Sequence, residues 1–336
     1  MTIQSSERTA ADVLGELKNL VDPVLAAHVD GLPPLMRTIA RYHFGWDDSA
    51  GSGKALRPAL AVLGARAAGA RGDEPEVLDA ACAVELIHNF SLLHDDIMDG
   101  DRTRRHRPTA WTVYGTDQAL LAGCALHTLA FEVLARRGLS EAVSTLGQDV
   151  QLLIAGQSDD LALAARKHAT VEECLAMEAG KTASLLSSAA ALGARAYRAP
   201  GTVTAVLAEY GHHLGMAFQM VDDLLGIWGE SSRTGKPVAA DLRARKRSAP
   251  VVAALVSDTP AAAELAVLYA GDGELADRQV RRAAELVAAA GGRDWTEQRA
   301  QFHTEEALGR LDQLGAPPAT VADLTGVTRF LLARTW

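Results

Sequence analysis

The 336-residue sequence has only three cysteines, Cys82, Cys124 and Cys174, and none of them lies in a CxxC motif. This scarcity argues against a disulfide framework or a structural zinc site, and it predicts a reducing, cytoplasmic location. The N-terminal segment mixes charged and apolar side chains, so we expect no signal peptide. No charge-free stretch reaches the roughly eighteen residues of a membrane span, so we also expect no transmembrane segment.

Basic residues are too few to balance the acidic ones. The chain has 33 Lys and Arg against 42 Asp and Glu, which gives a net charge of −9. Such a chain is a poor candidate for holding a phosphate backbone over a broad surface, so we expect no nucleic-acid partner. A small anion-binding pocket is still compatible with this charge, because a pocket depends on a few local side chains.

Aromatic residues make up only 5% of the chain, and no segment shows the alternation of a half-buried strand. The long segments are rich in Ala, Leu, Glu and Arg, which lose little entropy on entering a helix. Apolar residues recur three or four positions apart, as at Val203, Val206, Leu207 and Tyr210. Turn formers separate roughly ten to twelve such segments without a linker or an internal repeat. We therefore expect an all-α fold: a single domain over residues 1–336, built as one large helical bundle with a central cavity between its helices.

Three aspartates lie at the end of an apolar segment that reads ACAVELIHNFSLLHDDIMDGD over residues 81–101. On a helix, Asp95, Asp96 and Asp99 share a sector of roughly 100° on one side. Carboxylates this close repel one another and raise the pKa of at least one member unless a cation neutralises them. Mg²⁺ prefers oxygen ligands and keeps positions for substrate phosphates. We call these residues the first acidic cluster and predict that it binds Mg²⁺; the alternative is a solvated helix end.

Two further observations favour the metal site. Glu85 and His88 precede the cluster on the same face of the segment, as in the wall of a wet cavity, although a lone histidine is more often satisfied within a core. The segment MAFQMVDDLLG (216–226) repeats the pattern with Asp222 and Asp223, and Gln219 lies one turn earlier. We call Asp222 and Asp223 the second acidic cluster. Facing the first cluster across a bundle core, it would complete a metal site for a polyphosphate.

Basic residues occur in short, separate groups before, between and after these acids. Each one alone predicts no more than a surface charge. Together with two acidic clusters they indicate the anion-binding half of a diphosphate pocket, because Arg and Lys bind phosphate oxygens. The residues are Lys54, Arg57, Arg104, Arg105, Lys181, Lys236 and Lys246.

Motifs of other enzyme classes are absent. The segment Gly51–Lys54 is not a P-loop, because Asp48 occupies the first glycine position and Ala55 the Ser/Thr position. The sequence contains no GxSxG, HExxH or GxGxxG motif. Hydrolase and dinucleotide-binding functions therefore have no support.

In their order and spacing, these motifs resemble those of trans-isoprenyl diphosphate synthases of the polyprenyl synthetase family, from about Gly53 to Lys246. The resemblance implies an isoprenoid synthase bundle that joins isopentenyl diphosphate head-to-tail to an allylic diphosphate, with about three Mg²⁺ ions. HDDIMDGD resembles the family's first aspartate-rich motif and FQMVDD the second, so both acidic clusters would ligate Mg²⁺.

The resemblance also implies roles for the residues around the clusters. Isopentenyl diphosphate would contact Lys54, Arg57, His88 and Arg105. The allylic diphosphate would contact Arg104, Lys181, Gln219, Lys236 and Lys246, and Thr182 would lie near the reacting carbons.

The chain departs from the family pattern at Gly226, where many members have a third aspartate in the second motif. This glycine removes one metal-ligand position but leaves Asp222 and Asp223, with Asp241 as a possible helper. The first motif also contains Asp101, but we favour Asp99 as its third member.

Product length depends on the residues before Asp95. Phe90 and Ser91 lie five and four residues upstream, about 6 to 7.5 Å down the helix axis. By resemblance these positions form the floor of the product tunnel. A bulky Phe90 favours a short chain, while a small Ser91 leaves a way past it. We expect farnesyl (C15) or geranylgeranyl (C20) diphosphate as the product.

Two other functions stay open from the sequence. A terpene cyclase of similar fold acts on one prenyl diphosphate and could dispense with Lys54, Arg57, His88 and Arg105, all of which are present. A non-catalytic partner subunit of a heteromeric prenyl synthase usually has eroded aspartates, whereas the first acidic cluster is intact. The family resemblance also suggests a homodimer.

Overall fold

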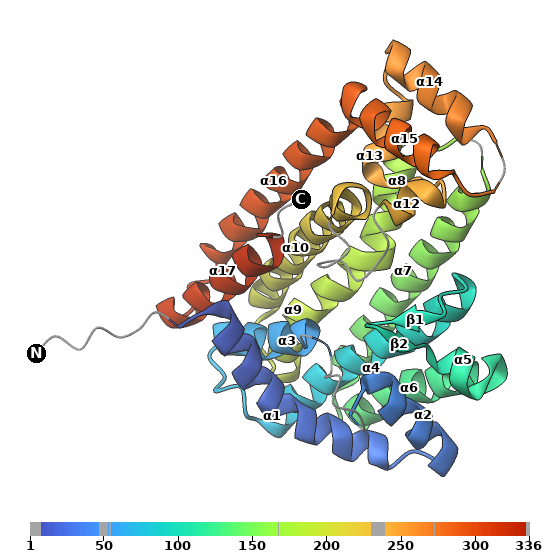
Figure 1. Cartoon of the computed structure of the whole chain (residues 1–336). Helices are drawn as coiled ribbons and strands as arrows, with labels where there is room; N and C mark the ends of the chain where they lie inside the picture. The colour runs from blue at the N-terminus through green and yellow to red at the C-terminus, as the bar shows by residue number, and fades with distance from the viewer. Residues whose placement is uncertain are drawn as a thin grey trace, which may run out of the picture. The chain divides into compact units, whose positions relative to one another are not determined.

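A computed structural model describes residues 8–46, 53, 55–166, 168–229, 239–271 and 273–333 of the chain (Figure 1). These residues are almost entirely helical, which confirms the predicted all-α fold. Among the described residues the only strands are β1 (Thr103–Arg104) and β2 (Arg107–Pro108), which pair antiparallel. The sequence pattern did not reveal this hairpin, because a strand of two residues is too short to show alternation.

Contacts within the chain divide it into two compact units, which are described separately. Unit 1 holds the described residues up to Asp149, together with Leu185–Gly211 and Arg310–Val327. Unit 2 holds Val150–Ser184, His212–Gly309 and the described residues from Thr328 onward. The single domain expected over residues 1–336 stays a prediction.

Most helices belong to one unit, and several long ones contribute to both. Unit 1 contains α1 (Ala10–Asp30), α2 (Pro34–Phe44), α3 (Leu56–Ala67), α4 (Pro75–Met98), α5 (Ala110–Tyr114) and α6 (Thr116–Arg136). Unit 2 contains α8 (Val171–Glu178), the π-helix η1 (Ala179–Ala183), α12 (Ala240–Arg243), α13 (Ala249–Leu255), α14 (Pro260–Tyr269) and α15 (Asp277–Ala289). The shared helices are α7 (Ser140–Ala165), α9 (Ser184–Ala196), α10 (Gly201–Trp228), α16 (Gly292–Leu311) and α17 (Pro318–Leu332).

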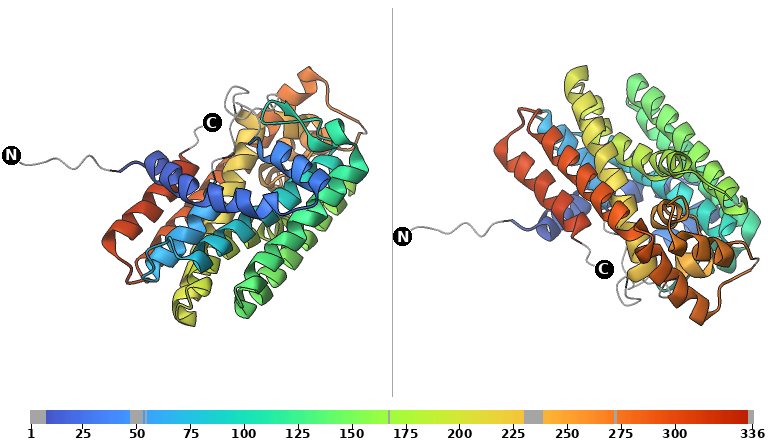
Figure 2. Two further views of the ribbon diagram at one scale, coloured as in Figure 1. Left: turned by 90° about the horizontal axis from the view of Figure 1, so that it is seen from below. Right: turned by 90° about the horizontal axis from the view of Figure 1, so that it is seen from above.

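Helix α4 forms the centre of unit 1 and packs against α3 and α6 (Figure 2). The consecutive residues 80–84 of α4 are all buried, as expected of a helix that is covered on every side. Helices α3 and α9 also approach closely, because a Cβ atom on Gly193 would lie 1.9 Å from the carbonyl oxygen of Ala61. A glycine is therefore required at this crossing.

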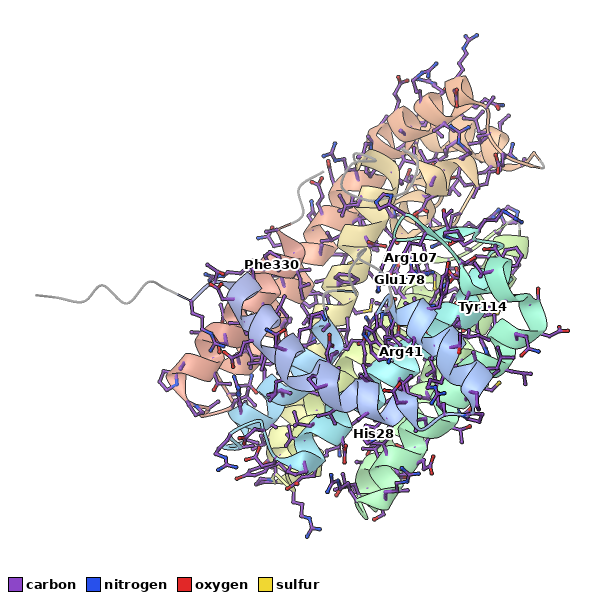
Figure 3. All side chains as sticks on the ribbon, turned by 60° about the horizontal axis from the view of Figure 1, so that its bottom comes forward. His28, Arg41, Arg107, Tyr114, Glu178 and Phe330 are labelled. Atoms are coloured by element: carbon purple, nitrogen blue, oxygen red, sulfur yellow. The ribbon has the colours of Figure 1, made fainter. Side chains whose placement is uncertain are left out.

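A buried carboxylate joins three helices at the far end of α4 from the first acidic cluster. Asp79 is 3% exposed, and its Oδ1 lies 2.7 Å from Nε2 of His28 on α1, which Figure 3 labels. Its Oδ2 accepts a hydrogen bond of 2.5 Å from Nε of Arg137 at the end of α6. Burial raises the pKa of Asp79, but the hydrogen bonds from His28 and Arg137 outweigh burial and lower it below its ordinary value. The carboxylate stays ionised and holds the three helices together.

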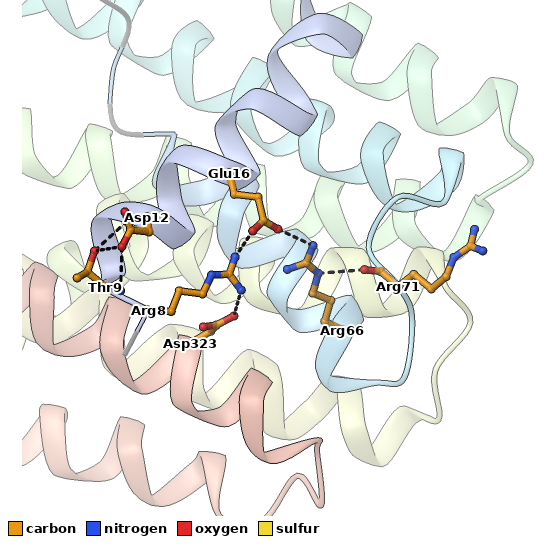
Figure 4. A network of polar contacts seen from close by, with 7 residues as sticks. All are labelled: Arg8, Thr9, Asp12, Glu16, Arg66, Arg71 and Asp323. Atoms are coloured by element: carbon orange, nitrogen blue, oxygen red, sulfur yellow. Dashed lines mark hydrogen bonds and ion pairs between the residues drawn. The ribbon is translucent and has the colours of Figure 1, made fainter. Parts of the chain in front are cut away.

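The first turn of α1 is held by a surface network of charges (Figure 4). Arg8 forms ion pairs with Glu16 and with Asp323 of α17, the latter at 3.1 Å. Glu16 also pairs at 3.1 Å with Arg66 of α3. These pairs are partly solvated and contribute little each, but the network links α1, α3 and α17 within unit 1.

Helix α6 carries both buried and exposed apolar side chains. Of the described helices, α6 alone is long and apolar enough to cross a membrane by itself, and 44% of the apolar stretch is buried within the protein. Its buried residues include Leu126 and Leu134, while Leu120 and Leu121 are exposed. Since α6 packs against α4, its apolar composition is at least partly that of a core helix.

Candidate functional site

The first acidic cluster lies in unit 1 at the C-terminal end of α4. Asp95 and Asp96 belong to the last turn, and Asp99 is the C-cap residue. Asp96 is only 1% exposed, whereas Asp99 is exposed. Within the described part of the chain, Oδ2 of Asp96 is buried without a hydrogen-bond partner. Burial raises the pKa of Asp96, and the charges of Asp101 and Asp99 add to that shift while Arg104 opposes it.

The β1–β2 hairpin brings Arg104 to this cluster. Nε and Nη2 of Arg104 both lie 2.7 Å from Oδ1 of Asp96. The turn residues Arg105 and His106 have φ angles of 51° and 61°, the left-handed conformation that a tight two-residue hairpin requires. The hairpin is fastened to α2, because the hydroxyl of Tyr42 donates a 2.8 Å hydrogen bond to the carbonyl oxygen of Pro108.

Arg107 of β2 adds a second attachment to α2 (Figure 3). Its guanidinium lies 4.5 Å from the ring centroid of Tyr42 and donates a 3.1 Å hydrogen bond to the Tyr42 carbonyl. The Tyr42 ring in turn meets Tyr114 edge-on at 5.4 Å. Cation–π and aromatic contacts of this kind stabilise the hairpin by roughly 1 kcal/mol each. They hold Arg104 of β1 and Arg105 of the turn at a defined place.

Arg57 and His88, both predicted from the sequence to bind one diphosphate, are in direct contact within unit 1. Nη1 of Arg57 lies 3.1 Å from Nε2 of His88. Burial, together with the positive charge of Arg57, lowers the pKa of His88 well below its ordinary value, so the imidazole is neutral. Because arginine only donates, Nε2 accepts and the proton is on Nδ1.

Glu85 and Arg105 belong to the same group of charges. Burial lowers the pKa of Arg57 to about 10, while Glu85 opposes that shift, so Arg57 stays protonated at neutral pH. Burial also lowers the pKa of Arg105, and the negative charge of Glu85 again opposes this shift. Asn89 donates a 3.0 Å hydrogen bond to Oε1 of Glu85. Arg57, His88 and Arg105 therefore lie in one group of charges with the half-buried Glu85, and the two arginines of this group can attract an anion. Lys54, predicted to join them, lies outside the described residues.

His43 of α2 is a member of this region that the sequence did not indicate. It lines one pocket with Tyr42, Asp96, Arg104, Arg105 and Arg107, among other residues. Burial and the three arginines lower the pKa of His43 to about 3. No motif surrounds His43 in the sequence, and its position follows only from the packing of α2 against α4 and α6.

The second acidic cluster lies in unit 2 on α10. Asp223 is 3% exposed, and both of its oxygens accept hydrogen bonds. Oδ1 accepts from Nε2 of Gln219 at 2.7 Å, and Oδ2 accepts from the backbone N–H of Ala249 at 2.8 Å. Oε1 of Gln219 accepts from the Thr182 hydroxyl at 2.7 Å. Burial raises the pKa of Asp223 to about 6. Thr182, Gln219 and Asp223 thus form one hydrogen-bonded chain, and Asp222 beside them is exposed.

Lys181 and Thr182 lie in η1, where a π-helical turn carries them against α7. Nζ of Lys181 donates a 2.5 Å hydrogen bond to Oδ2 of Asp160. A Cβ atom on Gly156 would lie 2.2 Å from the backbone N of Lys181, so only glycine allows α7 to come this close. Asp160 was missed in the sequence, although the pair of acids in the apolar segment GQSDDLAL carries the same signal as the second acidic cluster.

Lys246 is surrounded by the carboxylates of unit 2. Burial lowers its pKa, but Asp241, Asp223, Asp160 and Asp222 outweigh burial and raise it above the ordinary value. The predicted residues Lys181, Gln219, Asp222, Asp223 and Lys246 are therefore gathered in one region of this unit. Lys236 lies outside the described residues.

Phe90 and Ser91 occupy α4 one turn before the first acidic cluster. Phe90 is 9% exposed, and its ring meets those of His94 at 4.8 Å and His127 of α6 at 5.0 Å. The Ser91 hydroxyl donates to the carbonyl oxygen of His88 at 2.9 Å. Gly123 makes room for His94, because a Cβ atom there would lie 2.4 Å from Nε2 of the imidazole. The ring of His127 on α6 therefore packs against Phe90 and limits its movement.

The carboxylates of both units fit a hard divalent cation. Among the described residues no three acidic, histidine or cysteine side chains already converge as a complete ligand set. Mg²⁺ does not need such a set, because it is commonly held by one or two carboxylates together with waters and substrate phosphates. The buried Asp96 oxygen without a partner, next to two more aspartates, is the kind of atom that such an ion satisfies.

Comparison with known proteins gives a consistent set of similarities. The polyprenyl synthetase family pattern matches residues 40–287. The (2E,6E)-farnesyl diphosphate synthase of Mycobacterium tuberculosis is 40% identical over 339 residues, covering 97% of this chain and 94% of that protein. The geranylgeranyl diphosphate synthase of the same species is 42% identical over 312 residues, covering 89% and 88%.

Solved structures show the same similarity in three dimensions. A polyprenyl synthetase from Streptomyces coelicolor A3(2) is 43% identical with a TM-score of 0.88, covering 95% of this chain and 98% of that one. A polyprenyl synthase from Caulobacter crescentus CB15, complexed with calcium and isoprenyl diphosphate, is 28% identical with a TM-score of 0.86, covering 98% and 99%.

Proposed function

The chain belongs to the polyprenyl synthetase family, and we propose that it is a Mg²⁺-dependent short-chain trans-prenyltransferase. It condenses isopentenyl diphosphate head-to-tail with an allylic diphosphate and releases diphosphate. The product is farnesyl (C15) or geranylgeranyl (C20) diphosphate, the products in the names of the two mycobacterial relatives. The observation that carries the proposal is the pairing of two aspartate clusters with separate groups of basic residues in a chain so similar to these synthases.

The first acidic cluster (Asp95, Asp96 and Asp99) and the second (Asp222 and Asp223) are the proposed ligands of the magnesium ions. When bound, Mg²⁺ supplies positive charge that stabilises the departing diphosphate of the allylic substrate. The calcium in the Caulobacter structure supports a divalent cation in this family. About three ions are expected with substrate bound, as the family resemblance implies.

Arg104, Lys181, Lys246 and Lys236 bind the oxygens of the allylic diphosphate in this proposal. Arginine and lysine stabilise the negative charge that develops as the allylic carbon–oxygen bond breaks. Gln219 orients Asp223 through the 2.7 Å hydrogen bond, and Thr182 orients Gln219 in the same way. The first step then leaves an allylic carbocation and a bound diphosphate.

Arg57, His88, Arg105 and Lys54 hold the diphosphate of isopentenyl diphosphate. Its alkene attacks the carbocation, a carbon–carbon bond forms, and the proton that is lost passes to the departing diphosphate. No side chain is required as a base. Apolar side chains around the growing chain exclude water, which would otherwise quench the cation. The proximity of Arg57, His88 and Arg105 supports a second diphosphate site, which a cyclase acting on one substrate does not need.

The wider assignments also belong to this proposal. We expect a homodimer, supported by the exposed Leu120 and Leu121 on α6. A cytoplasmic location is supported by free cysteines, because Cys82, Cys124 and Cys174 form no disulfide. The acidic net charge of −9 argues against a nucleic-acid partner.

Product analysis tests the proposal directly. Purified protein is incubated with Mg²⁺, isopentenyl diphosphate and dimethylallyl, geranyl or farnesyl diphosphate, and the products are identified by mass. We expect C15 or C20 prenyl diphosphate. A cyclic hydrocarbon from one substrate would identify a cyclase instead, and no turnover without a second protein would identify a partner subunit.

A matched pair of variants separates the two substrate sites. Arg57→Lys keeps the charge but loses the planar fork, so KM for isopentenyl diphosphate should rise at least tenfold while KM for the allylic substrate stays within twofold. Arg37→Lys, at a half-buried position of α2 whose guanidinium donates to the carbonyl oxygen of Asp30 at 3.3 Å, should change neither constant. Equal effects of Arg57→Lys on both substrates would contradict a separate site.

A further inference from the structure

The second acidic cluster lacks the acid that completes the first one. In the first cluster Asp95 and Asp96 are followed by Asp99, one turn beyond Asp95. The corresponding position, one turn beyond Asp222 on α10, is Gly226. Residues four apart on a helix lie on the same face, so the missing side chain would have pointed to the side of Asp222.

Another carboxylate occupies the space beside Gly226. A Cβ atom built on this glycine would lie 2.2 Å from Oδ2 of Asp241 and 2.8 Å from its Cγ. In an aspartate side chain, standard bond lengths place the carboxylate oxygens about 2.4 Å from Cβ. The Asp241 oxygen therefore lies about as far from the Cβ position as the oxygen of an aspartate at residue 226 would lie. Asp241 lies in the first turn of α12, fifteen residues further along the chain.

The glycine and the acid depend on each other. Any side chain at residue 226 would collide with the Asp241 carboxylate, so glycine is needed for this approach. Asp241 also acts on the other charged groups of the region: it raises the pKa of Asp223 and that of Lys246. Asp241 thus belongs to the same group of charges as Asp222 and Asp223.

A second, independent feature of this region points to a cation site. Glu178 at the end of α8 (Figure 3) is 1% exposed. Its Oε2 has no hydrogen-bond donor within the described part of the chain. Glu178 faces Asp223 and Lys246, which are the charged groups that act on it. Oε1 of Glu178 accepts from the Cys174 thiol at 3.6 Å, so Oε2 is the atom that a bound cation or its water ligand would satisfy.

We propose that Asp241, in the space left by Gly226, supplies the third carboxylate of the second acidic cluster and ligates the same divalent cation as Asp222. The inference deepens the proposed function and rests on it, because the cation is the one that a prenyl diphosphate synthase uses. Asp223, whose two oxygens already accept from Gln219 and Ala249, is held in place by the protein beside this ion.

Metal binding by the full chain tests the inference without turnover. Mn²⁺ replaces Mg²⁺ as the probe, inorganic diphosphate is present, and bound Mn²⁺ is measured by electron paramagnetic resonance. All variants also carry Asp95→Asn and Asp99→Asn, which remove the more exposed carboxylates of the first acidic cluster. We expect Asp241→Asn to weaken Mn²⁺ binding at least tenfold, as loss of a ligand or its support does.

Two more variants separate the position of the carboxylate from its mere presence. Gly226→Ala keeps every charge but displaces the Asp241 carboxylate, so Mn²⁺ binding should again weaken at least tenfold. The exchange Gly226→Asp with Asp241→Gly returns a carboxylate to the same space from α10. Mn²⁺ binding should then recover to within threefold of that of the parent, the protein with only Asp95→Asn and Asp99→Asn. Circular dichroism will show whether each variant folds. If Asp241→Asn does not fold, the exchange variant provides the folded comparison.

The matched control is Asp277→Asn. Asp277 is exposed and pairs at 2.6 Å with Arg243 of α12, so this variant loosens the same helix without touching the acidic cluster. Mn²⁺ binding should stay within twofold. Unchanged Mn²⁺ binding in Asp241→Asn, or a folded exchange variant that fails to recover it, would refute the role of Asp241.

Failure of this inference is distinguishable from failure of the proposed function. If the unmodified protein forms prenyl diphosphate while Asp241→Asn binds Mn²⁺ normally, only the role of Asp241 is wrong. If the unmodified protein forms no product, the proposed function is wrong, and the Mn²⁺ comparison still reports whether Asp241 is a ligand.

Discussion

Gly156 allows the close approach that positions Lys181 and Thr182 of η1, which we propose for the active site, and Gly156→Ala should reduce activity through backbone displacement alone. The added methyl group would lie 2.2 Å from the backbone N of Lys181, 2.6 Å from the carbonyl carbon of Gly180 and 2.9 Å from Cα of Lys181. Ordinary van der Waals contact begins at 3.4 Å, so α7 and η1 must separate by about 1.2 Å, the difference between the two distances. These atoms are backbone, so no side-chain rotation can relieve the contact.

The expected magnitudes follow from that displacement. A misplacement of about 1 Å in a catalytic group costs roughly 10²-fold in rate, so kcat should fall by about that factor. Alanine is favoured over glycine in a helix by about 1 kcal/mol, but overpacking costs about 1–3 kcal/mol, so the free energy of unfolding should fall by about 1 kcal/mol. The variant should fold, because this loss is small compared with the stability of a protein of this size.

Gly147→Ala on the same helix is the control. A Cβ atom on Gly147 would meet only Cε1 of Phe131 at 3.8 Å, an ordinary contact. This variant should gain up to about 1 kcal/mol of stability and keep the kcat of the parent. Steady-state kinetics and urea unfolding of both variants provide the comparison. If Gly156→Ala matches Gly147→Ala in kcat and in stability, the close approach of α7 to η1 is not needed.

Three further outcomes can be checked on the same protein. Phe90→Ala should lengthen the products seen by mass spectrometry, with the ring of His127 as the next barrier; an unchanged profile would remove Phe90 from the tunnel floor. Because the folded-state pKa of Asp79 is lowered by His28 and Arg137, its contribution to stability is present above the unfolded pKa of about 3.9 and is lost as pH falls through the lower folded value. The melting temperature of the parent should therefore exceed that of Asp79→Asn at pH 6, and this difference should shrink progressively as pH falls below about 4; a difference that does not shrink on acidification would contradict the ion pair. Removal of divalent metal by a chelator should abolish condensation and Mg²⁺ should restore it, whereas full activity in the chelator would exclude the metal.

The sequence predicted the helical fold because its signal is local. Apolar residues three and four positions apart, as at Leu56, Leu60 and Leu63, form one side of a helix whatever else the chain does. The two-residue strands of the hairpin and the π-helical turn η1 carry no such period. They follow from contacts with other elements, such as those of Tyr42 with the hairpin and of Gly156 with η1.

The same distinction between local sequence patterns and contacts with distant elements applies to the candidate site. Asp95, Asp96, Asp222 and Asp223 were predicted because adjacent acids in apolar helices are visible in the sequence. The partners that hold these acids were not predicted, because they come from distant segments: Arg104 for Asp96, and the backbone of Ala249 for Asp223. The roles of all these site residues stay predictions, and Lys54 and Lys236 also lie outside the described residues.

The hydrogen bond from the backbone N–H of Ala249 to Asp223 affects how the sequence can change over evolution. A main-chain donor survives every substitution at its position except proline, which has no N–H. The side chain at position 249 is 2% exposed and therefore limited in size by its neighbours, yet its chemistry is irrelevant to holding the carboxylate. Natural variants with glycine, serine or cysteine at this position would keep the acid oriented, whereas proline would leave Oδ2 buried without a donor. The carboxylate at position 223 is required for this contact, whereas the side chain at position 249 is not. Substitutions should therefore accumulate at position 249 before they occur at position 223.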